Sequence, residues 1–456
     1  MTRSGLWALP RPLLLALGGL TALVLVQQQV LLRRPPRLQM LAIQPLRSGA
    51  GALDVRFSRP MQRETIAAES RIKPELSHAW FGADNAWRLL LNRTDPIQSP
   101  LQLDLAGADR RGLRVAPSRW FWDPRPTLLA VVQLKEGQQL QLQDRQGSWV
   151  PLSPVLPGIF QVEPFGDGRG VAFVSADDNG DQFVDVRHLT PRSLATDADA
   201  VGSPLLGDLE RITQQPQLFA HVSSNLRGDL LVQAGRLEPG SDQLWMRSPD
   251  GRRRDLSLKV AGPIRLLPDG TGLVVPGYDG LELLSLQTLQ DQASERQTLP
   301  GSRDLRAFCT GSGRALLVRH WPDYRRSVEL VIPGLPPRQI WLGEQAVMGV
   351  ACDNGGERLW VVLRDSLPKA VDTLLLLDRD GKVRKQRRLE PWLMAPDSLL
   401  RFDPVSDQLL LSVISSRRAP GRIAWVDGST LGLRIQAEPS VVSATLLPAA
   451  GRIDRF

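Results

Sequence analysis

One short run of polar residues, at positions 177–185, has the residue types and spacing that calcium binding requires. It reads Asp-Asp-Asn-Gly-Asp-Gln-Phe-Val-Asp and places side-chain oxygens at Asp177, Asn179, Asp181 and Asp185. Ca²⁺ prefers such hard oxygen ligands, supplied at alternate positions of a loop. The run departs from the usual twelve-residue calcium loop, because its glycine is fourth rather than sixth and no glutamate stands at position twelve. The pattern therefore predicts a calcium site at these four residues, with a polar hairpin as the alternative.

Other residue types that could carry chemistry are sparse. The two cysteines, Cys309 and Cys352, are 43 residues apart, and no spacing of cysteine and histidine typical of zinc occurs. The four histidines are far apart in the sequence. There is no Gly-x-Ser-x-Gly motif for a nucleophilic serine. Apart from the calcium run, the sequence predicts no metal or cofactor site.

A turn signature that recurs eight times after residue 120 predicts the elements that position these residues. Each copy is an apolar residue, a short turn rich in Pro, Asp, Asn and Gly, and then a run of aliphatic residues. The copies start at Trp122, Phe165, Val222, Leu267, Cys309, Cys352, Phe402 and Leu447. Steps of 42 to 57 residues separate them, which is typical of a repeat built from four short strands. We therefore predict a seven-bladed β-propeller over residues 118–456, with eight blades as the alternative.

Within this region the repeats resemble the blades of TolB-type propellers and their WD-repeat relatives. The matching stretches are Phe-Gly-Asp-Gly-Arg-Gly-Val-Ala-Phe-Val-Ser at residues 165–175 and Leu-Trp-Met-Arg-Ser-Pro-Asp-Gly at residues 244–251. In the second repeat, strands are expected at residues 158–163, 170–175 and 182–187. The longest step, of 57 residues, predicts an insertion near residues 190–204. The last copy is too short for a blade and is expected to close the ring.

The repeat register also identifies side chains near the propeller axis, where propeller enzymes carry their reacting groups. Two residues before the repeat starts, the charged residues are Glu163 and Arg265; the next layer contributes His221 and Arg401. One carboxylate and one arginine form neither the paired acids of a glycosidase nor a set of metal ligands. We therefore predict no catalytic residue. The two cysteines fall on neighbouring innermost strands, which we expect to lie beyond the roughly 7 Å limit for a disulfide, so we interpret both as buried apolar side chains.

Residues 38–117 are predicted to form a separate small β-domain. Strands are expected at residues 53–57, 71–74, 86–91 and 101–105, separated by turn residues, with a short polar and helical stretch before Ser70. The run Val-Arg-Phe-Ser-Arg-Pro-Met at residues 55–61 resembles bacterial Ig-like domains of the SbsA type. This resemblance implies an Ig-like β-sandwich that acts as an extracytoplasmic spacer or adhesion module and carries no site residues.

The first 37 residues are predicted to hold a membrane anchor and a linker. Residues 12–32 contain no charged side chain, and arginines flank them on both sides. An uncharged stretch of 21 residues can cross roughly 30 Å of hydrocarbon as a helix. A cleaved signal peptide is the alternative, although no small-residue cleavage site follows Val26. We expect a transmembrane helix in the bacterial inner membrane, with the N-terminus in the cytoplasm and the bulk of the chain in the periplasm.

Composition and charge narrow the classes of function. The chain of 456 residues is 42% hydrophobic and 23% charged, which is typical of a globular protein. Its net charge of +8 comes mainly from arginines scattered among acidic residues, whereas nucleic-acid-binding proteins concentrate Lys and Arg on one face. We therefore expect no nucleic-acid partner. The combined prediction is a membrane-anchored extracytoplasmic binding or scaffold protein that recognises a protein or glycan; a propeller-type hydrolase with a loop-built, calcium-assisted site is the alternative.

Overall fold

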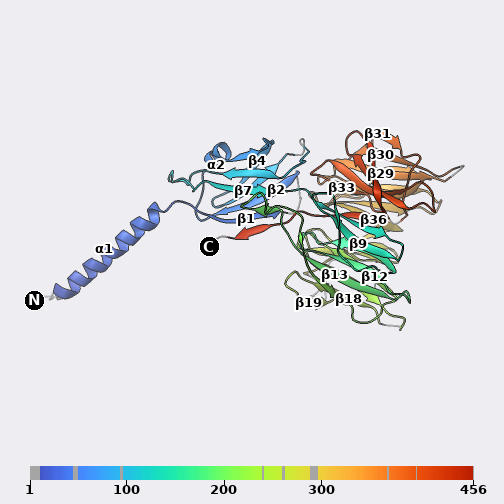
Figure 1. The fold of residues 1–456 in the computed structure, drawn as a ribbon, viewed down its shortest axis with the longest axis horizontal. Helices are drawn as coiled ribbons and strands as arrows, with labels where there is room; N and C mark the ends of the chain where they lie inside the picture. The colour runs from blue at the N-terminus through green and yellow to red at the C-terminus, as the bar shows by residue number, and fades with distance from the viewer. Residues whose placement is uncertain are drawn as a thin grey trace, which may run out of the picture.

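The chain is almost entirely β-structure in the computed structural model (Figure 1). The model describes residues 11–44, 50–92, 96–238, 241–258, 262–287, 296–366, 369–396 and 398–454. Among these residues there are two helices, α1 (Arg11–Arg33) and α2 (Arg63–Glu69). Figure 1 shows α1 projecting away from a two-sheet body, which is followed by a larger body made of many sheets.

Five four-stranded antiparallel sheets form most of the larger body, and in each sheet the strands pair in sequence order. The first sheet contains β11 (Gly158–Pro164), β12 (Gly170–Ala176), β13 (Gln182–Thr190) and β15 (Leu205–Arg211). The second contains β16 (Phe219–Ser224), β17 (Leu230–Gly235), β18 (Gln243–Arg247) and β19 (Arg253–Asp255). The third contains β20 (Arg265–Leu266), β21 (Gly272–Gly277), β22 (Gly280–Ser285) and β23 (Arg296–Pro300). The fourth contains β24 (Arg303–Cys309), β25 (Arg314–His320), β26 (Arg326–Val331) and β27 (Arg338–Gly343), and the fifth β28 (Ala346–Cys352), β29 (Arg358–Asp365), β30 (Val371–Asp378) and β31 (Val383–Arg388).

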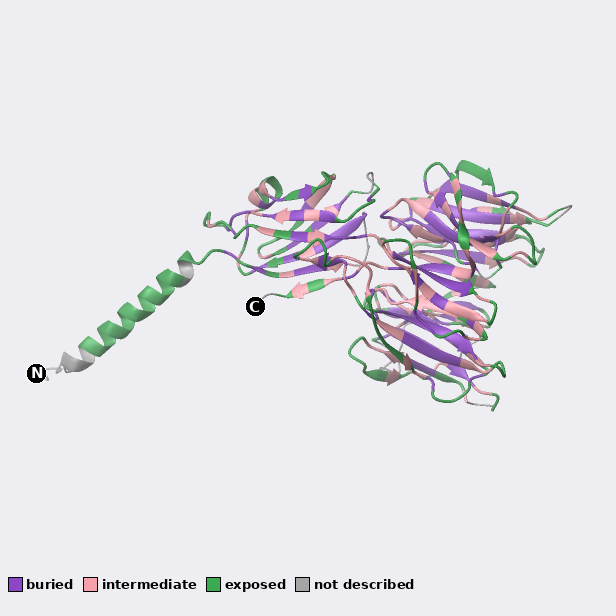
Figure 2. Cartoon of the chain, in the orientation of Figure 1, coloured by how far each residue is buried: buried purple, intermediate pink, exposed green. Residues whose placement is uncertain are grey.

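Burial changes across each sheet in the way that stacked sheets require. All seven residues of β12 are buried, whereas the outer strand β15 is exposed at every position except Glu210. Figure 2 shows the same contrast between buried inner strands and exposed outer loops. A strand that is apolar on both faces is covered by a neighbouring sheet on each side. The strands predicted at residues 158–163, 170–175 and 182–187 are confirmed as β11, β12 and β13.

An eight-stranded sheet joins the beginning and the end of this body. Its strands are β8 (Thr127–Gln133), β9 (Gln138–Gln143), β10 (Trp149–Pro151), β32 (Leu393–Met394), β33 (Arg401–Asp403), β34 (Gln408–Ile414), β35 (Gly421–Asp427) and β36 (Leu433–Leu447). The long strand β36 pairs with β35 through its first residues and with β8 through its last. It therefore divides the sheet into two further groups of four and removes a free edge on each side. This set of four-stranded units is consistent with a β-propeller.

The two-sheet body contains strands from three separate parts of the chain. One sheet has the order β37-β1-β2-β5-β4 and the other β14-β7-β6-β3. The strands are β1 (Leu38–Gln44), β2 (Gly51–Phe57), β3 (Arg71–Lys73), β4 (His78–Ala83), β5 (Ala86–Leu91), β6 (Leu101–Leu105), β7 (Ser118–Trp122), β14 (Leu194–Ala195) and β37 (Arg452–Asp454). β14 lies in the long connection predicted near residues 190–204, and β37 lies at the end of the chain. Both segments therefore tie the propeller to the smaller body, which encloses a core that includes Trp120 and Trp122.

The expected transmembrane helix, and with it the expected single-pass inner-membrane location, is wrong. Within the described part of the chain, no helix has the length and apolar character needed to cross a membrane. Residues 11–33 do form α1, but its strongly apolar run, residues 13–26, is 14 residues long. At 1.5 Å per residue such a run extends about 21 Å, less than the roughly 30 Å of a hydrocarbon core, and three glutamines follow it. Residues 12–32 are uncharged, but the stretch is not apolar throughout, because three glutamines follow residue 26.

The interpretation of the cysteines as separate apolar side chains is also wrong. Cys309 and Cys352 form a disulfide, with their Cα atoms 5.6 Å apart. Both residues are buried at the ends of β24 and β28, the innermost strands of neighbouring sheets. The ends of β24 and β28 therefore lie closer together than packed sheets do, which are about 10 Å apart on average. Because disulfides persist mainly in oxidising compartments, this bond favours a location outside the reducing cytosol.

Candidate functional site

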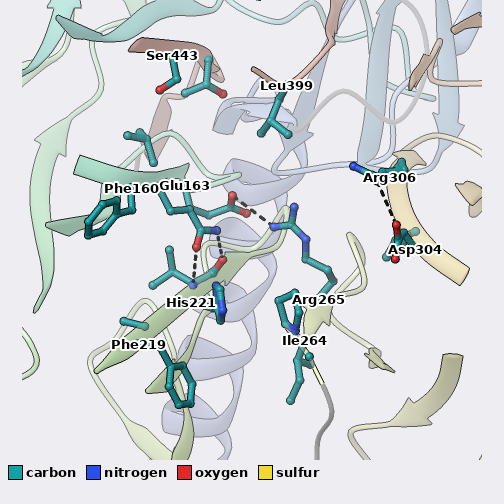
Figure 3. A pocket seen from close by; sticks show the side chains of 18 of the residues that line it. Phe160, Glu163, Phe219, His221, Ile264, Arg265, Asp304, Arg306, Leu399 and Ser443 are labelled. Atoms are coloured by element: carbon teal, nitrogen blue, oxygen red, sulfur yellow. Dashed lines mark hydrogen bonds and ion pairs between the residues drawn. The ribbon is translucent and has the colours of Figure 1, made fainter. Parts of the chain in front are cut away.

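A cavity of about 790 Å³ lies where the innermost strands of several sheets converge (Figure 3). Its walls come from β8, β11, β16, β20, β24 and the last part of β36. Because four of the five four-stranded sheets contribute their first strand, this axial cavity lies at the centre of the propeller. A second cavity, of about 290 Å³, adjoins it, and Glu163 and Thr445 line both.

Contacts between two neighbouring sheets hold the polar side chains on one wall of the axial cavity. The Gln161 side chain donates to the carbonyl of Val222 at 2.7 Å and accepts from its backbone N–H at 3.1 Å. One carboxylate oxygen of Glu163 accepts from the backbone N–H of Ser224 at 2.9 Å. These bonds connect β11 to β16 and fix the Glu163 carboxylate, whose side chain is 13% exposed. The carboxylate is therefore a positioned, partly desolvated charge.

Two arginines lie around this carboxylate. The second oxygen of Glu163 lies 3.9 Å from Nη1 of Arg265, which is an ion pair rather than a hydrogen bond (Figure 3). Arg401, on β33, lines the adjoining cavity. Within the described structure, its buried Nε has no hydrogen-bond partner. Burial lowers the pKa of Arg401; the Glu163 charge opposes this effect and Arg265 adds to it.

His221 is the histidine that lines the axial cavity, and Figure 3 shows it beside Arg265. Burial lowers its pKa, and the positive charge of Arg265 lowers it further. The ring is therefore neutral at pH 7. Within the described residues, no hydrogen bond joins this ring to a carboxylate or to a serine, threonine or cysteine nucleophile. A general base in acyl transfer needs such a partner, so the geometry contains no nucleophile–base pair at His221.

The rest of the cavity wall combines exposed apolar side chains with paired charges. Phe160 is 61% exposed and Leu399 is 40% exposed. Arg306 donates to Asp304 at 3.0 Å, and His320 also contacts that carboxylate at 2.9 Å. The charges of this part of the wall therefore neutralise one another, while the apolar side chains offer contact area to a ligand.

The predicted calcium residues lie in and beside the hairpin between β12 and β13. Asp177 accepts from the backbone N–H groups of Asn179 and Asp181, each at 2.9 Å, so one of its oxygens closes the turn. In the described residues, no group of three or more acidic, histidine or cysteine side chains is arranged to hold a metal ion. This arrangement has the features of the polar hairpin, and the calcium site stays a prediction.

The fourth predicted ligand, Asp185, lies farther along β13 and is buried. Its carboxylate accepts from Ser175 Oγ at 2.8 Å and forms an ion pair with Arg211 at 2.9 Å. Cation–π contact with Phe183 also orients Arg211. Asp185 therefore already has partners that satisfy its charge.

Glu163, His221, Arg265 and Arg401 form what we call the axial cluster. The repeat register predicted that each lies near the axis, but not that they lie close to one another. Glu163 and Arg265 were assigned to one layer, and His221 and Arg401 to the next, and neither layer alone formed a site. In the structure, Glu163, His221 and Arg265 line the axial cavity, and Glu163 and Arg401 line the adjoining one. Taken together, the two layers contain two arginines and one carboxylate. This combined charge is the sequence feature that indicates the cluster.

No family model and no curated protein match the sequence. Among solved structures, the chain is similar to the periplasmic gluconolactonase PpgL of Pseudomonas aeruginosa (17% identity, 71% of this chain and 99% of that chain, TM-score 0.47). It is also similar to a putative 6-phosphogluconolactonase of Bacteroides uniformis ATCC 8492 (14%, 73% and 100%, TM-score 0.46) and to TolB of Acinetobacter baumannii (12%, 65% and 78%, TM-score 0.40).

These likenesses are distant, and we take neither an activity nor a ligand from them. The strand pairing described above is the basis for describing the larger body as a propeller. The Ig-like assignment of residues 38–117 is not confirmed and stays a prediction, as do the domain boundaries at residues 37 and 117.

Proposed function

We propose that this chain is a binding protein of an oxidising compartment and that it holds a segment of a protein partner in its axial cavity. The observation that supports this proposal most strongly is the composition of the cavity wall. Exposed Phe160 and Leu399 supply apolar contact area, and Glu163 and Arg265 supply fixed charges. Apolar anchors combined with a few positioned polar groups are typical of ligand-binding pockets and of the centres of protein interfaces.

Binding accounts for the cavity better than hydrolysis does. A hydrolase site needs a nucleophile or an activated water and a base that is itself oriented by a third group. In the described structure, His221 has no such orienting partner, and Asp304 is engaged by Arg306 and His320. Both cysteines are consumed by the disulfide. These side chains are arranged to make contacts rather than to transfer protons.

A site-specific photo-crosslink in the native cell envelope tests the proposal. A benzophenone side chain is placed at Phe160 in the full-length chain and, as a matched control, at Tyr324, which is 89% exposed and does not line the cavity. We expect a discrete adduct from position 160 that excess purified wild-type chain competes away, and no such adduct from position 324.

The same purified chain is assayed against ester, lactone and glycoside substrates, with and without added calcium. No turnover above the background rate is expected. Turnover that is lost in a His221→Gln or Glu163→Gln variant would show that the axial cavity is an active site, and would contradict the binding proposal.

A further inference from the structure

The charges around the axis do not balance. Arg265 and Arg401 bring two positive charges, and Glu163 brings one negative charge. His221 is held neutral by burial and by the charge of Arg265. A partly buried space thus holds one positive charge more than its own residues compensate.

The other charged residues that line the two cavities are engaged elsewhere. Arg303 donates to Glu329 at 2.7 Å, and Arg306 is paired with Asp304. Asp403 accepts from the backbone N–H of Val405 at 2.9 Å and also from Ser406. Burial raises the pKa of its carboxyl, and the positive charge that acts on it comes from Arg145, which lines neither cavity. The surplus charge is therefore located at Arg265 and Arg401 rather than spread over the wall.

Arg401 has the less complete environment of the two. Its Nε is buried and unpartnered within the described structure, and the side chain lines the second cavity beside Glu163. A buried donor without an acceptor destabilises the folded state, and more so when the group is charged. Arg265, whose contact with Glu163 is 3.9 Å long, also has donors that a hydrogen-bond acceptor could use. Within the described residues, the two arginines of the cluster share one negatively charged acceptor, Glu163, and lack a second.

We infer that Arg265 and Arg401 form a carboxylate-binding site at the propeller axis, which receives an acidic side chain or the C-terminal carboxylate of the bound segment. This inference rests on the proposed function, because it assigns a ligand chemistry to the same cavity. A carboxylate matches the planar donors of a guanidinium and forms the strong, charge-assisted hydrogen bond that Nε of Arg401 lacks in the described structure.

A carboxylate fits this site better than a phosphate dianion does. One negative charge neutralises the surplus, whereas two negative charges would leave an excess unless His221 took up a proton. Burial and the neighbouring Arg265 oppose that protonation. The site therefore favours a monoanion.

A titration of the full-length chain with trifluoroacetate, followed by ¹⁹F NMR at constant ionic strength, tests the site. We expect saturable binding that acetate displaces at lower concentration than inorganic phosphate. Arg265→Gln and Arg401→Gln are expected to weaken binding at least tenfold. Arg306→Gln, which alters an arginine of the same cavity that already has a carboxylate partner, is expected to leave it unchanged. Absent saturation in the wild type, equal binding in Arg401→Gln, or displacement by phosphate before acetate overturns the inference.

An Arg401→Met variant separates loss of the site from loss of the fold. Because it removes a buried charge that has no hydrogen-bond partner at Nε, it is expected to melt at or above the wild-type temperature while losing the probe. A lower melting temperature together with retained probe binding would show a structural role for Arg401 and overturn the inference. The Phe160 crosslink distinguishes the two proposals: a specific adduct without probe binding rejects the carboxylate site alone, and probe binding without an adduct rejects the protein partner.

Discussion

At the scale of single residues, buried charged side chains are of two kinds. Some have an oppositely charged partner and stabilise the fold, and others are incompletely paired and are available to a ligand. Arg303 and Glu329 are 7% and 5% exposed and lie 2.7 Å apart, so each compensates the charge of the other, although Nη1 of Arg303 has no hydrogen-bond partner in the described structure. Arg401 as a whole is half-buried, but its Nε is buried and has no acceptor in the described structure. A buried arginine can therefore either stabilise the fold or bind a ligand. The presence or absence of an acidic partner decides which.

The buried pair gives a prediction for stability. Glu329→Gln leaves Arg303 without its charge partner and is expected to lower the free energy of unfolding by about 3–5 kcal/mol, because breaking a buried pair leaves an uncompensated charge. Urea denaturation measures the change. Asp323→Asn, which breaks the exposed pair with Arg325, is the control and should leave the unfolding midpoint in place. Equal midpoints for both variants would contradict this account.

His221 gives a prediction for the pH dependence of stability. Its folded-state pKa is lowered, by burial first and Arg265 second, so the folded protein binds this proton less readily than the unfolded chain does. Its contribution to stability is present above the unfolded pKa of about 6.5 and is lost as the pH falls through the folded-state value. His221→Gln is therefore expected to lose less stability than the wild type between pH 7 and 5. Thermal melts across this range test the difference, with His78→Gln as a control outside the cavity; parallel curves for His221→Gln and the wild type would reject it.

At the scale of elements, the propeller is fastened by segments that come from distant parts of the chain. β36 pairs with both β35 and β8, and β14 and β37 add strands to the two sheets of the smaller body. The disulfide between the ends of β24 and β28 is a covalent link between neighbouring sheets. Closure of the ring and its attachment to the smaller body therefore depend on long-range strand pairing.

The disulfide gives a prediction at this scale. A Cys309→Ser/Cys352→Ser variant opens a link across a sequence separation of 43 residues, and we expect it to lose about 2–4 kcal/mol of stability. Urea denaturation of the oxidised wild type and of the variant measures the loss. Thiol titration of the protein secreted to an oxidising compartment is the control and should find no free thiol. Two free thiols there, or equal stability of the variant, would contradict the assignment.

Much of the architecture could be predicted from the sequence, because each repeat carries its own turn and aliphatic strand. The strands at residues 158–163, 170–175 and 182–187 followed from such local patterns. The disulfide and the roles of β14 and β37 did not, because they depend on how strand ends converge in space. The transmembrane prediction for α1 was wrong for a different reason. The absence of charge over residues 12–32 does not make a stretch long enough to cross a membrane, because three glutamines end the apolar run. The members of the axial cluster could be named from the repeat register, but only the fold shows that Nε of Arg401 has no acceptor among the described residues.

At the scale of the whole molecule, two bodies joined by β14 and β37 present a ring of sheets around one axial cavity. The wall of that cavity combines exposed apolar side chains with Arg265, and Arg401 adds a second positive charge from the adjoining cavity. Such a ring offers a rigid surface whose ligand chemistry is set by a few inward-facing residues. This arrangement is suited to holding a segment of a partner that brings a negative charge.

The yield of the Phe160 photo-crosslink, compared between the otherwise wild-type chain and chains that also carry Arg265→Gln or Arg306→Gln, tests the central claim most directly. If the axial cavity holds an acidic segment of a protein partner, the adduct is lost in Arg265→Gln and kept in Arg306→Gln. An adduct of equal yield in all three chains, or none in any of them, would contradict the claim that this cavity is the recognition site.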